Sequence, residues 1–447
     1  MNADVKKHKV SVARYQTPLE SVRKAVDLCG GLDHLPAGAQ VFIKPNVVFW
    51  SRFTAFPKWG VITTSRVVED MVVLLKERGI EDIVIGEGMV LDDPKDRETP
   101  ADAFESLGYN KLKRRYGIKV VDVHQGSFKK VEFDDGVFLK FNADFLNSDF
   151  VVNIPVLKTH AQTKVSLGIK NIKGTLDVNS RKKSHSADPE RNLNFRIAKF
   201  VEIIPPCFTV LDGIYTSERG PGFDGKMRRS NLLVGSPDLL SADKVGAKIV
   251  GLDPSEVPHL VQAAHNLGRP DDLSDVEVMG ESIEEVAAPH QYSFPYAEDD
   301  DESLPLPMKR MGVKGLSYRK YDLTMCTYCS TLNGIILTAI AQAWQGEPWD
   351  DVEVLTGKTM KPTPGKKKTI LLGKCIYQAN KDDPNINEMI AVKGCPPSTK
   401  RIVEAFNEAG IPLNYDLFEN KEKIPGFFMK RYQGKPEFDE SFFKIDD

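Results

Sequence analysis

The sequence has little excess charge of either sign and no long apolar segment. Sixty Lys and Arg side chains stand against sixty-three Asp and Glu, a formal net charge of −3. Proteins that bind nucleic acid or anionic membranes usually carry a basic excess, so we expect neither as a partner. Residues 1–15 contain no apolar run of signal-peptide length, and no segment approaches the roughly 20 apolar residues that span a bilayer. We therefore expect a cytoplasmic protein.

Glycine-rich nucleotide-binding patterns are also missing. The chain contains no Walker A run, and no G-x-G-x-x-G pattern follows an expected strand, so nothing predicts a bound nucleotide or flavin. Cysteine is sparse, with six residues in 447. In a reducing compartment six cysteines do not predict a disulfide framework, and grouped cysteines instead favour metal or redox chemistry.

The first part of the chain alternates between expected strands and expected helices. A chain of this length exceeds one hydrophobic core, so more than one domain is expected. Alternation of this kind predicts an α/β fold with a doubly wound, mostly parallel sheet. Residues 131–141 look different, because two short strands flank Asp135 and Gly136 and so predict an added hairpin. The helix over residues 65–78 is expected to end at Gly79.

We expect a large domain over residues 1–290, a linker over 291–320 and a smaller α/β domain over 321–447. The periodicity fades in the linker range, and its acidic stretch at 299–302 is typical of a solvated segment. Short apolar strands and amphipathic helices resume after it.

Four cysteines in the small domain form the strongest chemical signal. Cys326 and Cys329 form a C-x-x-C pair, and the expected strands before Cys375 and Cys395 each end in glycine, lysine and cysteine. The carboxyl ends of parallel strands share one edge of a sheet, where ligands collect. Four thiolates are soft ligands, and the set favours a [4Fe–4S] cluster.

Two alternatives to an iron–sulfur cluster stay open. Structural zinc also uses four thiolates, although its sites more often contain two C-x-x-C pairs. Unligated core or redox thiols would need no metal. Cys29 ends an amphipathic helix and Cys207 opens a strand, so both are interpreted as core residues.

A basic segment follows the expected strand that ends at Pro155. Lys158 and His160 come directly after it, and Lys170 and Lys173 share one face of a short helix. Lysines at the carboxyl edge of such a sheet are well placed to hold a phosphate or carboxylate. Residues 181–183 are expected to form a solvated basic face instead.

Three further strands are expected to end in polar residues. Lys44 and Asn46 follow one of them, Glu87 stands between two glycines, and Asp212 is expected at the end of a third. Together they favour one binding site. The residues expected to hold an anionic ligand or cofactor are Lys44, Asn46, Lys158, Lys170 and Lys173. Those expected to move protons are His160, Glu87 and Asp212, with metal ligation as the alternative role of Glu87 or Asp212.

Several motifs together resemble a known family. IKPNVV, VIGEG, NIPVLKTH with GIKNIKG, LDGI with GPG, and VGSPDLLSADKVGAKIVGLDP occur in the order and spacing of domain-of-unknown-function family 362, over about residues 10–285. The resemblance implies iron–sulfur ligands, which many members carry in an added ferredoxin module. This chain lacks the C-x₂-C-x₂-C-x₃-C-P run of that module. Its KGCPP segment is similar to the cluster-ligating segment of the small subunit of respiratory complex I.

The leading functional expectation is an iron–sulfur oxidoreductase or electron-transfer protein. It would act on an anionic small molecule that bears phosphate or carboxylate, with a redox protein as a second partner. One alternative is a non-redox transferase or isomerase in which the cluster is structural. Another is an assembly or docking subunit of an anaerobic enzyme complex. The sequence does not choose between them.

Overall fold

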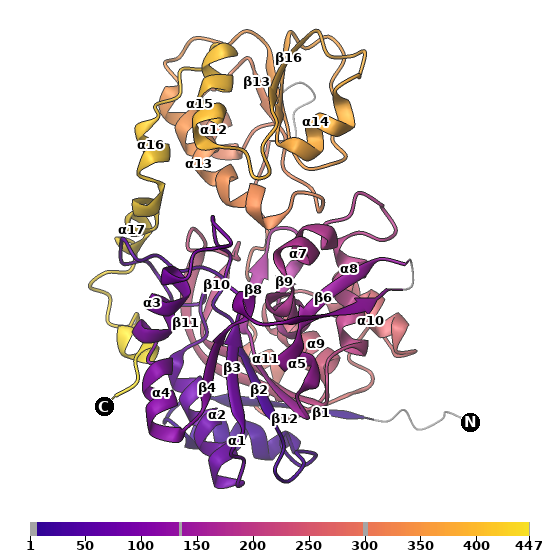
Figure 1. Ribbon diagram of the computed structural model, residues 1–447, viewed down its shortest axis with the longest axis vertical. Coiled ribbons are helices and arrows are strands. Elements are labelled where there is room, and N and C mark those ends of the chain that lie inside the picture. The colour runs from indigo at the N-terminus through magenta and orange to yellow at the C-terminus, as the bar shows by residue number, and fades with distance from the viewer. Residues whose placement is uncertain (1–6, 134–135, 298–302, 447) are drawn as a thin grey trace. The chain divides into compact units, whose positions relative to one another are not determined.

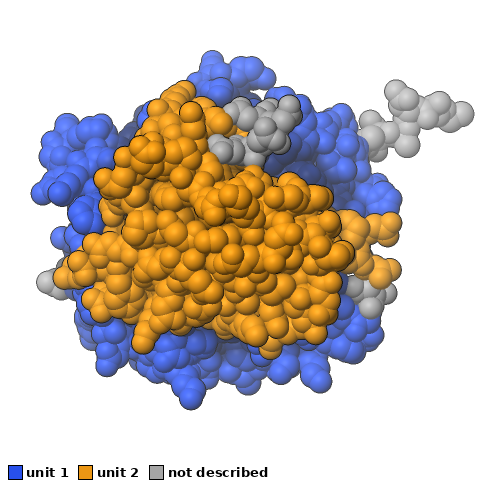
Figure 2. Space-filling model, turned by 90° about the horizontal axis from the view of Figure 1, so that it is seen from above, with its two compact units in different colours: residues 1–183, 194–293, 425–447 blue, residues 184–193, 294–424 orange. Residues whose placement is uncertain are grey.

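The chain forms two compact units. The computed structural model describes residues 7–133, 136–297 and 303–446. Unit 1 comprises Met1–Lys183, Asn194–Ser293 and Pro425–Asp447, and unit 2 comprises Ser184–Leu193 and Phe294–Ile424 (Figure 2). None of the helices in the described ranges is both long and apolar enough to cross a bilayer.

Unit 1 is built on a ten-stranded sheet with the order β12-β1-β11-β10-β7-β2-β3-β4, to which β8 and β9 are added through β10. The strands are β1 (His8–Arg14), β2 (Val41–Pro45), β3 (Ile83–Glu87), β4 (Lys119–Asp122), β7 (Phe150–Ile154), β8 (Val156–His160), β9 (Lys164–Ser166), β10 (Cys207–Glu218), β11 (Lys226–Ser236) and β12 (Val276–Gly280). Most neighbours are parallel, and β11 runs antiparallel to both β1 and β10. The expected α/β architecture with a mostly parallel sheet is confirmed.

Helices flank this sheet, as Figure 1 shows for α2 and α4 near one end and α5 and α9 on the right of the view. They are α1 (Glu20–Cys29), α2 (Ser65–Glu77), α3 (Glu98–Ser106), α4 (Tyr109–Tyr116), α5 (Ala143–Asn147), α6 (Gly168–Asn171), α7 (Val178–Ser184), α8 (Leu193–Ala198), α9 (Leu239–Ile249), α10 (Pro258–Asn266) and α11 (Ile283–Val286). Short 3₁₀ turns include η2 (Ile172–Thr175) and η3 (Lys199–Glu202). In α2 the apolar residues at helical spacing are buried, and Gly79 follows the helix with φ +76°, as expected for its C-terminal glycine.

The added hairpin is a separate two-stranded antiparallel sheet of β5 (Phe128–Glu132) and β6 (Phe138–Asn142). Gly136 has φ +72°, which suits a tight turn. Asp135, named in the expectation, lies outside the described residues.

β7 ends at Ile154, beside the expected strand end at Pro155. The chain does not leave the sheet there, however, because it resumes at once as β8, which pairs with β10 and β9. Lys158 and His160 therefore lie within a strand. Asp212 lies in the middle of β10 rather than at its end, and the register of β10 against β11 shifts just after it, between Gly213 and Tyr215. That irregularity follows from a glycine inside a long strand.

The C-terminal segment 425–447, assigned to the small domain in the sequence analysis, packs within unit 1. The phenol of Tyr432 accepts the N–H of Met227 at 3.0 Å, and the indole of Trp59 donates to the carbonyl of Asp439 at 3.2 Å. The ring of Trp59 also contacts Phe438. Aromatic burial of this kind ties the segment, with α17 (Ile424–Met429) and η6 (Glu440–Phe443), to the core of unit 1.

Unit 2 is a small α/β domain with a four-stranded parallel sheet, β13-β14-β15-β16. Its elements are α12 (Leu306–Arg310), β13 (Leu316–Tyr318), α13 (Thr327–Ala343), β14 (Val352–Leu355), β15 (Lys368–Leu372), α14 (Lys374–Asn380), β16 (Glu388–Val392), α15 (Thr399–Glu408) and α16 (Asp416–Glu419). The range expected as a linker, 291–320, supplies α12 and the edge strand β13, whose three residues are buried in the unit 2 core. Residues 299–302 lie outside the described part of the chain.

Candidate functional site

A buried ion pair stands at the carboxyl ends of β2 and β3. The Nζ atom of Lys44 lies 2.8 Å from Oε1 of Glu87, and the two side chains are 0% and 2% exposed. Glu87 also accepts the N–H groups of Val47 at 2.6 Å and Gly88 at 2.7 Å. Burial lowers the pKa of Lys44, and the charge of Glu87 opposes that shift. A buried pair with this many partners holds the two strand ends together.

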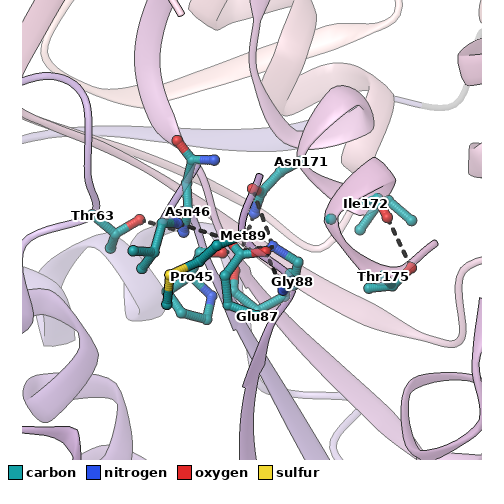
Figure 3. A network of polar contacts seen from close by, with 12 residues as sticks. Pro45, Asn46, Thr63, Glu87, Gly88, Met89, Asn171, Ile172 and Thr175 are labelled. Atoms are coloured by element: carbon teal, nitrogen blue, oxygen red, sulfur yellow. Dashed lines mark hydrogen bonds and ion pairs between the residues drawn. The ribbon is translucent and has the colours of Figure 1, made fainter. Parts of the chain in front are cut away.

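Two amides, Asn153 and Asn171, extend this pair into a network. Asn171 of α6 donates to the carbonyl of Lys44 at 3.1 Å and to Oδ1 of Asn153 at 2.8 Å. Asn153 of β7 donates in turn to the carbonyl of Gly168 at 3.1 Å. Figure 3 shows Asn171 beside Glu87 and Gly88. The network fixes α6 against β2 and β7.

Gly174 closes the network from η2. A Cβ atom at this position would lie 2.5 Å from Oε1 of Glu87 and 2.6 Å from Nζ of Lys44. Both distances are shorter than real Cβ contacts, so only glycine fits here. The glycine of the GIKNIKG motif is thereby explained by the close approach of the backbone to the ion pair.

Lys158 joins a second set of contacts near the end of β2. Its Nζ atom donates to Oδ1 of Asn46 at 2.7 Å and to the carbonyl of Val61 at 2.8 Å. The N–H of Asn46 donates to the hydroxyl of Thr63 at 2.8 Å, which Figure 3 shows. Burial lowers the pKa of Lys158 to about 7, against the opposing charge of Glu87.

The side chains of Asp212 and His160 are buried, and both accept hydrogen bonds from backbone N–H groups. Asp212 accepts the N–H of Thr64 at 2.7 Å and that of Ile214 at 3.1 Å, and burial raises its pKa to about 6. His160, at the end of β8, accepts the N–H of Gln162 on Nδ1 at 3.0 Å. A ring nitrogen that accepts carries no proton, so the other nitrogen, Nε2, is the protonated one when the imidazole is neutral.

Lys170 differs from Lys44 and Lys158 because its side chain has no polar partner in the described part of the protein. It lies on α6 and is half-buried, and its Nζ atom has no hydrogen bond or ion pair with any residue in the described ranges. Burial and the charges of Lys173 and Lys158 hold the pKa of Lys170 well below its usual range. We call Lys158, Lys170 and Lys173 the lysine cluster. Because burial and the neighbouring lysines disfavour the charged form of Lys170, an anion bound beside it would stabilise that form.

The segment 181–183 departs from the expected solvated face at its first residue. The guanidinium of Arg181 is buried and donates to the carbonyls of Gly174 at 2.7 Å and Leu176 at 3.0 Å. It thus supports the turn that carries Gly174. Nothing in the charge pattern distinguishes Arg181 from the two lysines that follow it.

In unit 2 the four cysteines lie on three chain segments, two of which are joined by backbone hydrogen bonds. The N–H of Gly373 donates to the carbonyl of Val392 at 2.8 Å, and that of Lys374 donates to Gly394 at 2.9 Å, which places Cys375 beside the segment of Cys395. A Cβ atom on Gly373 would lie 3.8 Å from the sulfur of Cys329. The C-x-x-C segment therefore adjoins the other two.

The pKa values of two thiols of the set, Cys329 and Cys375, are shifted by the other cysteines. The pKa of Cys329 is raised first by a hydrogen bond with Cys326, then by burial and by the charges of Cys326, Cys395 and Cys375. Burial raises the pKa of Cys375 as well, and Cys395 and Cys326 add to the shift. In residues 7–133, 136–297 and 303–446, no three His, Cys, Asp or Glu side chains adopt the arrangement of a metal site. The thiols are thus gathered but not arranged as in a liganded centre.

The two other cysteines lie apart, in unit 1. Cys29 is buried in the core at the end of α1 and donates to the carbonyl of Ala25 at 3.3 Å. Cys207 opens β10, and burial raises its pKa to about 12. Neither has an environment that would make it a reactive thiolate at neutral pH.

Residues 41–248 match the family model described as "Domain of unknown function (DUF362)". The matched range contains every polar residue of the unit 1 network described above. The resemblance inferred from the motifs is confirmed over this range, which is narrower than the motifs suggest. The four clustered cysteines lie outside it.

The proteins similar to this chain include the following two. The thylakoid-associated protein sll1697 of Synechocystis sp. (strain ATCC 27184 / PCC 6803 / Kazusa) is 28% identical over 253 residues, which cover 56% of this chain and 75% of that protein. The lactate racemase apoprotein from Thermoanaerobacterium thermosaccharolyticum is similar in structure over 57% of this chain and 59% of that one, with 13% identity and a TM-score of 0.32. A structural likeness this low carries no inference about activity.

Proposed function

We propose that this chain is an iron–sulfur protein that exchanges electrons with an anionic small molecule. In the proposal, Cys326, Cys329, Cys375 and Cys395 hold a [4Fe–4S] cluster in unit 2, and the lysine cluster of unit 1 holds a phosphate or carboxylate. The observation that carries it is the gathering of four cysteines from three separate segments around Gly373 and Gly394.

The donor set fits such a cluster chemically. Four thiols without a carboxylate or imidazole among them form a soft ligand set, which suits iron–sulfur or zinc better than hard cations. Thiols that raise one another's pKa bind protons in the metal-free chain, and a cation would relieve that repulsion. Cys326 stands at the N-cap of α13, whose dipole favours negative charge at that end. A bound [4Fe–4S] cluster supplies one-electron transfer.

The anion part of the proposal rests on Lys170. An ammonium that is half-buried, lacks an acidic partner and is repelled by two other lysines is stabilised when an anion binds. Lys44, Glu87 and Asn171 would act by positioning α6, since each is engaged with the protein itself. His160 and Asp212 are proposed proton carriers, because burial raises the pKa of Asp212 to about 6 and the ring of His160 offers Nε2 as a donor while Nδ1 accepts from Gln162.

The redox part is tested by reducing the anaerobically purified protein and recording its EPR spectrum during a potentiometric titration. The proposal predicts a one-electron signal that appears on reduction and disappears reversibly on oxidation. A cluster that stays EPR-silent across the accessible range of potential would instead favour a structural cluster in a non-redox transferase, isomerase or assembly subunit.

The anion part is tested separately by extracting small molecules from the purified protein and identifying them by mass spectrometry. Wild type should retain a phosphate- or carboxylate-bearing molecule, and Lys170→Met should lose it. Lys119→Met removes a lysine that is 62% exposed and paired with Asp82, so this variant should retain the molecule. Equal retention by both variants would contradict the assignment to Lys170.

A further inference from the structure

A cavity of unit 1 lies beside the end of β1, and no residue of the lysine cluster lines it. It has a volume of about 170 Å³ and is lined by Tyr15, Gln16 and Pro18, by Arg66 and Arg229, and by two residues of η6. Tyr15 follows directly on β1, which is parallel to β12 and, through the antiparallel β11, runs in the same sense as β10, β7 and β2. The cavity is therefore at the carboxyl edge of the sheet, where α/β proteins bind ligands.

The lining includes two arginines, of which only Arg66 is paired with an acid. No Asp or Glu is among the lining residues themselves. Arg66 contacts Glu69 at 3.3 Å and the exposed Asp446 at 3.4 Å. Arg229 forms no ion pair with any carboxylate in the described part of the chain. Guanidinium groups are well suited to bind carboxylate or phosphate, because their N–H donors match the geometry of both.

The guanidinium of Arg229 is held in place by contacts that do not use its Nη2 donors. Its guanidinium lies over two rings that contact each other, 4.7 Å from the centroid of Tyr215 and 4.3 Å from that of Phe442. Nε donates to Asn231 and Nη1 donates to the hydroxyl of Tyr215. No acceptor in the described ranges engages Nη2. The group is thus fixed in orientation and keeps donors for a ligand.

Tyr15 supplies a second donor with no partner. Its side chain is buried, at 5% exposure, and its hydroxyl has no hydrogen bond in the described part of the protein. Burial raises the pKa of Tyr15, so the hydroxyl keeps its proton and can donate. Leaving such a group without a partner costs stability unless a ligand accepts from it.

Asn231 connects the two donors. Its carbonyl accepts the N–H of Tyr15 at 2.8 Å, while its side chain accepts from Arg229. Asn231 adopts φ +51°, a left-handed conformation that is uncommon for a residue other than glycine. Strained positions of this kind tend to occur where a binding site is being held in shape.

From these contacts we infer that the cavity beside Tyr15 binds one small oxyanion, a phosphate or a carboxylate, through Tyr15, Arg66 and Arg229. The volume is below the roughly 300–1,000 Å³ of pockets for larger ligands, so it suits a single such group. This site is independent of the lysine cluster and of the cysteines.

The test uses the whole purified protein, with equilibrium dialysis of labelled inorganic phosphate and of labelled acetate at constant ionic strength. Burial raises the pKa of Asp70, an acid near Tyr15, to about 7. The measurement is made at pH 6, where the carboxyl group of Asp70 is protonated and does not repel the anion. Wild type should bind one of the two probes, and the probe that binds identifies phosphate or carboxylate as the ligand class. Tyr15→Phe should weaken that binding about ten-fold or more, because it removes a hydrogen bond to a charged group.

Tyr109→Phe is the matched control. Tyr109 is also buried in unit 1 with an unpartnered hydroxyl, but it does not line the cavity. Both variants should fold, since neither hydroxyl has a partner to lose, and Tyr109→Phe should bind as wild type does. Arg66→Gln should also weaken binding. The inference is overturned if wild type binds neither probe, or if Tyr15→Phe and Tyr109→Phe bind equally well.

Discussion

Replacing Glu87 by Gln tests whether the buried ion pair holds the carboxyl edge of the unit 1 sheet. The change keeps the volume of the side chain but removes its charge, which leaves the ammonium of Lys44 buried without a counter-ion. Glutamine also places an NH₂ group where Glu87 now accepts from Val47 or Gly88. Breaking one partner of a buried pair costs about 3–5 kcal/mol, and we expect a loss of that size in the free energy of unfolding of unit 1.

Because the chain has two units, the free energy of unfolding must be measured for unit 1 separately from unit 2. Urea-dependent hydrogen exchange of peptides that cover β2 and β3, followed by mass spectrometry, reports unit 1 alone. Lys119→Met is the matched control, because the pair of Lys119 with Asp82 is 62% and 43% exposed. Surface pairs contribute less than about 1 kcal/mol, so this variant should be near wild type.

The double variant Lys44→Met with Glu87→Gln gives the decisive comparison. It removes both charges together, so it should be more stable than Glu87→Gln alone. The reasoning about the pair is refuted if Glu87→Gln loses no more than the Lys119 control. It is also refuted if the double variant loses the full sum of the two single changes.

Two further predictions concern unit 1. Burial raises the pKa of Asp70 from 3.8 to about 7, so between these values the folded protein keeps a proton that the unfolded chain releases. The free energy of unfolding should therefore fall as pH rises through that window, by about 4 kcal/mol in full. Asp70→Asn should flatten the dependence of urea unfolding on pH. An unchanged dependence in this variant would contradict the raised pKa of Asp70. Gly174→Ala should cost about 1–3 kcal/mol, because its Cβ would press on Glu87 and Lys44, whereas Gly334→Ala in α13, with open space around it, should cost nothing.

The apolar patterning of the sequence predicts most of the central sheet. The strands β2, β3 and β7 are buried on both faces, as their continuous apolar runs indicate. The hairpin of β5 and β6 and the glycine after α2 also follow from local signals. Each of these features depends on neighbours in sequence, and for that reason it can be recognised without the structure.

Features that depend on distant partners could not be read from the sequence. Pro155 looks like the end of a strand, yet β10 is long enough to pair with β7 before it and with β8 after it. Asp212 precedes a glycine as a turn residue would, but that glycine marks an irregularity inside β10. The tail after Pro425 gives no sign that its aromatic residues pack in unit 1.

In the polar network, too, some residues could be predicted from the sequence and others could not. Lys44 and Glu87 stand out because charged residues after apolar strands are conspicuous. Asn153 and Asn171 were missed, because a neutral amide leaves no trace in charge or periodicity and its role appears only when both partners are placed. Tyr15 and Arg229 were missed for a similar reason, since they come from strands that become neighbours only in the folded sheet.

The metal content of anaerobically purified protein shows whether the four cysteines of unit 2 hold a [4Fe–4S] cluster. We expect about four iron and four labile sulfide per chain. Cys326→Ser and Cys395→Ser should lose most of this iron, whereas Cys29→Ser and Cys207→Ser, which change cysteines in unit 1, should keep it. Stoichiometric zinc, with no iron taken up on anaerobic reconstitution, would contradict the claim.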